Sequence, residues 1–414
     1  MQAREIHDAG GVDSAYAWMR LGLSMLLATI GGAGMWSVIV VLPAVEREFG
    51  VDRADASLPY TATMVGFALG NLLIGRFVDR FGVTGPLAIA SLALGSGFLL
   101  ASQAGSIWVF TALQGALIGF GSAATFGPLL ADVSHWFDKR RGLAMAATAS
   151  GNYLAGAIWP LVLQAAMAEH GWRGAYVLAG TVCLAVLVPL AFLLRRPPPH
   201  MARKGAPVPK APPPPKRSTS LSPGMLQFLL IIAGLGCCVA MSMPQVHIVA
   251  YCVDLGYGVA RGAEMLSLML AGGIVSRLAS GVLADRIGGL PTLLIGAVLQ
   301  CLALLLYIPY DGLASLYLVS LIFGLSQGGI VSSYAIVVRE YLPAREAGRR
   351  VGAVITATIV GMAIGGWMSG WIYDLTASYQ AAFLNGIAWN LLNIAMIVLI
   401  LLKSGRPRGT AVTA

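Results

Sequence analysis

The sequence is dominated by apolar runs of about 20 residues or more, separated by short polar segments. A helix of that length spans the hydrocarbon core of a bilayer, where the backbone must satisfy its own hydrogen bonds. Charged residues make up only 11% of the chain, whereas they are about a quarter of a soluble protein. The sequence therefore predicts an all-α integral membrane protein.

Twelve such runs are bounded by charges, prolines and glycines, which predicts 12 transmembrane helices. They cover residues 21–43, 57–78, 85–103, 108–130, 142–166, 173–194, 224–250, 262–284, 290–310, 313–338, 350–374 and 380–402. Between the sixth and the seventh lies a basic, proline-rich segment, which we expect to be an extended linker. The predicted organisation is a tail (1–20), a six-helix bundle (21–194), the linker (195–223), a second six-helix bundle (224–402) and a tail (403–414).

The basic residues are unevenly divided between the two sides of the membrane. With the N-terminus inside, 22 of the 27 Lys and Arg residues fall in inner segments, and only Arg47, Arg53, Arg173 and Arg261 fall in outer ones. Because basic loops stay on the cytoplasmic side, we expect both termini in the cytoplasm. This pattern also accounts for the net charge of +9, so we expect no nucleic-acid partner.

A short loop motif occurs twice. GRFVDRFG (75–82) follows the second predicted span and GVLADRIG (281–288) follows the eighth, and both fit GxxxDRxG. A six-span unit used twice indicates a parallel-repeat transporter with its site between two moving bundles. The alternative is that the charged residues of both motifs simply flank the membrane and have no conformational role. The candidate conformational latch residues are Gly75, Asp79, Arg80, Gly281, Asp285 and Arg286.

The doubled loop on a 6+6 plan resembles the major facilitator superfamily over essentially the whole chain. That resemblance implies two six-helix bundles, transport by alternating access and a monomer. Two further stretches resemble the monocarboxylate and oxalate/formate porters: HWFDKRRGLAMAATASGNYLAG (135–156) and HGWRGAYVLAG (170–180). This branch implies a small organic anion as substrate, above all a monocarboxylate, moved by proton symport or by anion exchange.

One basic residue, Arg277, falls inside a span. It lies eight residues before Asp285, about 12 Å into the helix, and no carboxylate is predicted near the middle of the membrane. A charge at that depth is costly and needs a partner, and a guanidinium can bind a carboxylate at two points. We therefore predict that Arg277 binds the substrate carboxylate. The alternative is that Arg277 donates to helix carbonyls or extends to the inner surface.

The porters of this branch carry an arginine at this place in the eighth helix that binds the substrate carboxylate, which supports the prediction. Oxalate/formate exchangers also carry a lysine in the eleventh helix. The stretch VITATIVGMAIGGWMSG has none, which favours a monoanion over a dianion. Animal-type lactate porters add an aspartate one turn before the arginine and a first-helix lysine. Gly273 and an uncharged span stand there, so that proton relay is not expected here.

Polar residues in other spans extend the candidate site. His247 and Tyr251 are four apart in the seventh span and share a helix face. Because imidazole titrates near neutral pH, His247 is the candidate proton carrier; a structural hydrogen bond is the alternative. The other candidates for lining the substrate path are Asn152, Tyr153, Tyr60, Gln327, Tyr334 and Trp36. For each of them, hydrogen bonding between helices is the alternative.

The sequence contains no GxxxxGK[ST] or HExxH motif, which argues against an ATP-driven pump and a zinc metalloprotease. We expect no cofactor, no metal site and no enzymatic activity. Two other functions stay open. One is an exporter of drugs or metabolites from the same superfamily, and the other is a transporter-like sensor or scaffold without net transport. The predicted location is the inner membrane of a bacterium.

Overall fold

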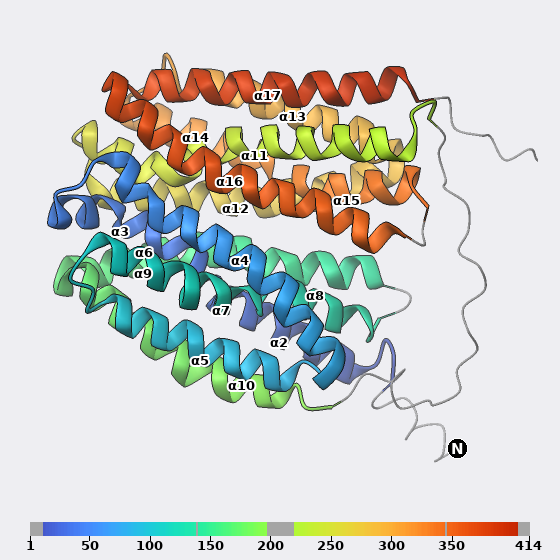
Figure 1. The fold of residues 1–414 in the computed structure, drawn as a ribbon, viewed down its shortest axis with the longest axis horizontal. Coiled ribbons are helices and arrows are strands. Elements are labelled where there is room, and N and C mark those ends of the chain that lie inside the picture. The colour runs from blue at the N-terminus through green and yellow to red at the C-terminus, as the bar shows by residue number, and fades with distance from the viewer. Residues whose placement is uncertain (1–10, 138–139, 197–218, 344–345, 405–414) are drawn as a thin grey trace, which may run out of the picture.

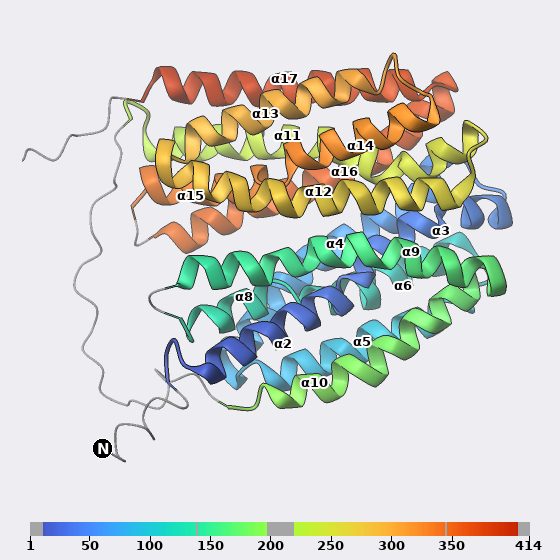
Figure 2. The same cartoon turned by 180° about the vertical axis from the view of Figure 1, so that it is seen from behind.

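Two helical halves lie side by side in the computed structural model, which describes residues 11–137, 140–196, 219–343 and 346–404 (Figures 1 and 2). The N half contains α2 (Ala15–Gly31), α3 (Ala33–Phe49), α4 (Arg53–Phe81), α5 (Thr84–Ala101), α6 (Ile107–Leu113), η1 (Gln114–Gly119), α7 (Phe120–Ala123), α8 (Gly127–Ser134), α9 (Arg141–Val182), η2 (Cys183–Leu187) and α10 (Val188–Leu193). The C half contains α11 (Pro223–Asp254), α12 (Gly258–Ile287), α13 (Gly289–Leu306), α14 (Leu313–Gln327), α15 (Ile330–Tyr341), α16 (Ala347–Thr376) and α17 (Tyr379–Leu402).

In the described chain, 11 helical segments are long and apolar enough to cross a membrane. The longest, Gly142–Leu193, has 52 residues, more than twice the length that a bilayer requires. Its helix is broken at Gly171, where φ is 66° and ψ is 178°, a conformation that glycine adopts without steric cost. The break separates two of the predicted spans, and the prediction of a 12-helix membrane fold is confirmed.

The first helix starts before the predicted beginning of its span at residue 21. It begins at Ala15, where the Ser14 hydroxyl accepts the N–H of Ala17 at 3.3 Å. This hydroxyl satisfies one of the N–H groups that lack a partner at a helix start. The polar residues up to Arg20 therefore continue the helix, although their charge suggested a tail.

A buried ion pair joins three helices of the N half. Nε and Nη2 of Arg20 donate to Asp132 on α8 at 2.7 and 2.8 Å, and the side chains of the two residues are only 1% and 4% exposed. Nη2 also donates to the carbonyl of Leu194 at 3.2 Å, just after α10. The guanidinium lies 4.6 Å from the centroid of the Trp136 ring. The predicted spans place both Arg20 and Asp132 outside the membrane.

Replacing Asp132 with Ala is expected to lower the melting temperature of the protein in detergent. The change leaves the guanidinium of Arg20 buried without a carboxylate, which costs about 3–5 kcal/mol. Asp285→Ala is the matched control, because Asp285 is exposed and such surface changes cost little. Equal melting temperatures for the two variants would contradict this role of the pair.

The two halves meet mainly where α4 packs against α16 and α9 against α12, and also where α3 contacts α11 and α12. Glycines allow the first pair to pack closely. A Cβ atom at Gly370 would lie 2.9 Å from the Ser57 hydroxyl, and one at Gly366 would lie 2.8 Å from the ring of Tyr60. Larger residues at either position would therefore force α16 away from α4.

The molecule has two distinct ends. We call the end where α2 begins and α17 finishes the terminal end, which is on the right in Figure 1. The opposite end, where α3 leads into α4, is called the distal end. The last residues of α10 and the first of α11 also lie at the terminal end (Figure 1). The basic-residue pattern predicts that the terminal end faces the cytoplasm.

Candidate functional site

Arg277 projects from α12 and contacts both halves. Its Nε donates to the carbonyl of Gly328 at 3.2 Å, and its Nη1 donates to the carbonyl of Ala149 on α9 at 2.9 Å. The guanidinium carbon lies 4.2 Å from the centroid of the Tyr153 ring. Among the described residues, Arg277 forms no ion pair. Two carbonyls and an aromatic ring thus surround this cation.

For Nε and Nη1, these contacts are those of the alternative in which Arg277 donates to helix carbonyls. A guanidinium has five N–H donors, however, and these two bonds use one on each nitrogen. The second N–H of Nη1 and those of Nη2 form the edge that binds a carboxylate at two points. The two carbonyls therefore leave three of the five N–H groups of Arg277 for other partners.

The position of Arg277 depends on close packing between α9 and α12. A Cβ atom at Gly273 would lie 2.7 Å from the ring of Tyr153, so glycine at this position lets the tyrosine reach the guanidinium. The tyrosine belongs to the N half and the arginine to the C half. The structure thus places Arg277 at the contact between the two halves.

Trp36 and Asn152 lie at the same junction of helices. The indole N–H of Trp36 is 2.9 Å from Oδ1 and 3.1 Å from the carbonyl oxygen of Asn152. A Cβ atom at Gly156 would lie 2.9 Å from the Trp36 ring and 2.2 Å from Leu270 of the C half. Trp36, Asn152 and Tyr153 are therefore brought together with Arg277 where α3, α9 and α12 meet.

His247, Tyr251 and Tyr60 form a second group. Nε2 of His247 lies 2.8 Å from the carbonyl of Gly366, the glycine that packs against Tyr60. The ring centroids of His247 and Tyr251 lie 5.9 and 5.0 Å from that of Tyr379, so both residues face the same tyrosine as their spacing predicted. Within the described chain, Nδ1 of His247 and the Tyr60 hydroxyl are buried without a hydrogen-bond partner.

The remaining two candidates lie inside the C half. Gln327 accepts a hydrogen bond from Nε2 of Gln245 at 2.7 Å. The Tyr334 hydroxyl donates to Asn393 at 2.7 Å, and both are fully buried. Both residues thus make the interhelical hydrogen bond that was the alternative to lining the path, and Gln327 also directly precedes the carbonyl that binds Arg277.

An ion-pair cluster that the sequence did not single out joins the halves at the distal end. Nη1 of Arg53 donates to Asp254 at 3.1 Å and to the hydroxyl of Tyr379, and its Nε lies 2.8 Å from Glu46. The guanidinium also lies 4.7 Å from the centroid of the Tyr373 ring. Arg53 is only 7% exposed, so helices of both halves enclose it. These five residues are called the Arg53 cluster below.

Asp374 adds a helix cap to the same end. Its two carboxylate oxygens accept the backbone N–H groups of Arg53 and Ala54 at 2.9 and 2.7 Å. Asp52, at the N-cap position of α4, makes no side-chain cap bond of its own. A carboxylate there is favoured by the free N–H groups and by the helix dipole. The C half therefore supplies the cap for a helix of the N half.

The predicted latch residues lie near the terminal end, and those that the structure describes make no close helix contact. Arg80, Asp285 and Arg286 are exposed, and a Cβ atom at Gly75 or Gly281 would meet no heavy atom within 4 Å. The side chain of Asp79 lies outside the described part of the structure. The contacts between the halves described above thus lie at the distal end and at the level of Arg277, and none of them includes a described latch residue.

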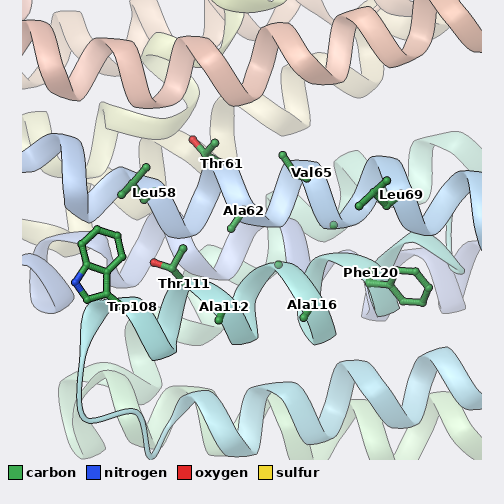
Figure 3. Close-up of a pocket in the computed structure, with 12 residues that line it drawn as sticks. Leu58, Thr61, Ala62, Val65, Leu69, Trp108, Thr111, Ala112, Ala116 and Phe120 are labelled. Carbon is green, nitrogen blue, oxygen red and sulfur yellow. The ribbon is translucent and has the colours of Figure 1, made fainter.

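A groove of about 500 Å³ lies between α4 and the α6–η1–α7 segment (Figure 3). Val65, Leu69 and Trp108 in its wall are exposed apolar side chains, as expected for a surface that faces lipid. Its described lining includes none of the nine predicted substrate-binding residues. The groove is therefore not the candidate anion site.

Two membrane-spanning helical halves that meet around a cation define a membrane transporter of the two-bundle class. The chain belongs to the Major Facilitator Superfamily, whose family model matches residues 24–335 and 265–413. The resemblance to this superfamily predicted from the doubled loop is confirmed.

Three similar proteins illustrate the range of the family. The MFS-type transporter pytF of Aspergillus terreus is 27% identical over 70% of this chain and 96% of its own. Monocarboxylate transporter 13 of Bos taurus is 28% identical over 84% of this chain and 86% of its own. The solved structure of the nucleoside transporter NupG matches with a TM-score of 0.73 at 12% identity, covering 92% of this chain and 99% of that one. The last likeness concerns the fold alone.

Proposed function

We propose that the protein is a secondary transporter of a small monocarboxylate. The observation that carries this proposal is the state of Arg277, a membrane-embedded cation between the halves that forms no ion pair among the described residues. A single cation suits a monoanion, because a second carboxylate on the substrate would be left without a counter-charge in a medium where charges are costly. The similarity to a monocarboxylate transporter supports the same substrate class.

The contacts between the halves support transport by alternating access. The Arg53 cluster and the Asp374 cap hold the distal end closed, whereas Gly75 and Gly281 of the latch motifs have open space around them. In this state the substrate reaches Arg277 from the terminal end. Movement of the halves then closes the latch loops and breaks the Arg53 cluster, so that Arg277 becomes accessible from the distal end.

The remaining parts of the proposal follow the sequence. Both termini lie in the cytoplasm of a bacterium, the protein is a monomer in the inner membrane, and transport is proton symport or exchange of one anion for another. His247 is the candidate proton carrier, since its Nδ1 is buried with no partner among the described residues. A proton on Nδ1 would be a buried donor that needs an acceptor nearby. Protonation of His247 would therefore depend on which group lies next to that nitrogen.

A ligand panel tests the substrate class. Short monocarboxylates are expected to raise the melting temperature of the purified protein, since a ligand that binds only the folded state stabilises it by mass action. Dicarboxylates of equal length are expected to raise it less. The increase should vanish in Arg277→Gln and persist in Arg261→Gln, which alters an exposed arginine of the same helix. Equal stabilisation of Arg277→Gln and the unchanged protein would refute the assignment.

A further inference from the structure

Two buried glutamines lie next to the Arg277 site and are joined to each other. Gln245 on α11 donates through Nε2 to Oε1 of Gln327, the last residue of α14, at 2.7 Å. Gln245 is 1% exposed and Gln327 is fully buried. Gly328, which follows Gln327 directly, carries the carbonyl that accepts Nε of Arg277. The amide pair therefore begins within one residue of the guanidinium's own partner.

The pair has one amide nitrogen and one amide oxygen without a partner. Oε1 of Gln245 and Nε2 of Gln327 are buried with no hydrogen-bond partner in the described chain. A buried polar atom without a partner costs free energy. If both amides were turned over, the donor and the acceptor would exchange places, so the pair presents one of each in either orientation. A group that donates and accepts through a single atom satisfies both.

We propose that the Gln245–Gln327 pair binds a hydroxyl group of the substrate, which makes the substrate a hydroxy monocarboxylate. This inference rests on the proposed function, because Arg277 holds the carboxylate from which the hydroxyl is positioned. The hydroxyl donates to the free amide oxygen and accepts from the free amide N–H. Since Gln327 adjoins the carbonyl that holds Arg277, the hydroxyl belongs on a carbon close to the carboxylate.

The amide pair discriminates between substrates, because a substrate without the hydroxyl leaves its two polar atoms without hydrogen-bond partners. A site that hydrogen-bonds a substrate hydroxyl discriminates strongly against the analogue that lacks it, because the polar groups of the site are then left unpaired. An unsubstituted acid of the same chain length would still bind Arg277 but would leave both amide atoms unsatisfied. The hydroxyl thus adds affinity beyond that of the carboxylate alone.

The test uses acids of one chain length: butanoate, 2-hydroxybutanoate and 3-hydroxybutanoate. Their dissociation constants are measured with the full-length protein in detergent, and their uptake is measured in proteoliposomes. The unchanged protein is expected to bind one of the hydroxy acids about tenfold or more tighter than butanoate. In the double variant Gln245→Leu/Gln327→Leu this preference should fall to about one, with the affinity for butanoate retained.

The double variant removes both partners together, so no amide is left unpaired and folding should be preserved. Gln227→Leu is the matched control, since it alters a glutamine of the same helix that bonds the carbonyl of Arg350. It should keep the preference. Equal binding of all three acids by the unchanged protein, or a preference that survives in the double variant, overturns the inference.

The outcome separates this inference from the proposed function. If butanoate binding disappears in Arg277→Gln while the double variant keeps the hydroxyl preference, only the role of the amide pair is wrong. If none of the three acids binds the unchanged protein, both proposals fail. A preference lost in the double variant and kept in Gln227→Leu supports the hydroxyl site.

Discussion

Uptake of monocarboxylate into proteoliposomes is expected to stop when Arg277 is replaced with Lys or Gln. Each hydrogen bond from a charged donor contributes about 1.5–3 kcal/mol, so loss of a two-point contact lowers uptake by about 100-fold or more. Lysine keeps the charge but offers a compact ammonium in place of a planar fork. The lysine variant therefore separates the need for geometry from the need for charge.

The control for this experiment lies on the same helix. Arg261 is 52% exposed and pairs with Glu264 three residues on, so Arg261→Gln should transport normally. The melting temperatures of both Arg277 variants must stay near that of the unchanged protein for the loss to be attributed to binding. Normal uptake by a well-folded Arg277→Gln protein would contradict the proposed role of this arginine.

Replacing Arg53 with Ala is expected to shift the protein towards a state that is open at the distal end. The change leaves Glu46, Asp254 and Asp374 close together without the cation between them, and removing one partner of a buried ion pair costs about 3 kcal/mol. That energy corresponds to a shift of about 100-fold in the populations of the two states. Transport should fall because the closed state is required in every cycle.

Thiol labelling measures this shift. Ser57 is fully buried behind Arg53, whose carbonyl accepts its hydroxyl at 2.7 Å, so Ser57→Cys introduces a thiol that reports on the distal contact. The five native cysteines are all buried and contribute little background. A membrane-impermeant reagent should label Ser57→Cys slowly, and much faster when Arg53→Ala is added.

Arg173→Ala is the matched control for the labelling. Arg173 also binds a glutamate at the distal end, but its partner Glu48 belongs to the same half. Its loss should therefore leave the labelling rate unchanged. Equal labelling rates with Arg53 and with Arg53→Ala would show that the cluster does not hold this end closed.

Most of the fold could be predicted because lipid imposes a simple rule on the sequence. Any long apolar run must become a helix, so the spans, their number and the two halves follow from runs, loops and the repeated motif. The start of the first helix at Ala15 was not predicted, because the charged residue Arg20 was taken as the boundary of the first span. Arg20 is a membrane-end residue whose charge is neutralised by Asp132, a pairing across 112 positions of the chain that no local pattern reveals.

The candidate site could be predicted in part. Arg277 was found because a charge in a span is rare, and Tyr153 and Asn152 were found because they are polar there. The carbonyl partners Ala149 and Gly328 have no sequence signal, since every residue has a carbonyl. The Arg53 cluster had a weak signal in the sequence, because few basic residues lie on the outer side, whereas acidic residues gather there. Charge counting alone does not show that they meet.

The cap that Asp374 places on α4 has a consequence for the state that is open at the distal end. When the halves separate at the distal end, the carboxylate leaves and the first N–H groups of α4 face the medium beside Arg53. The start of a helix with free N–H groups attracts anions. The cap is thus a contact between the halves that exists only while the distal end is closed. Once the halves separate, water or an anion must take the place of the Asp374 carboxylate at these two N–H groups.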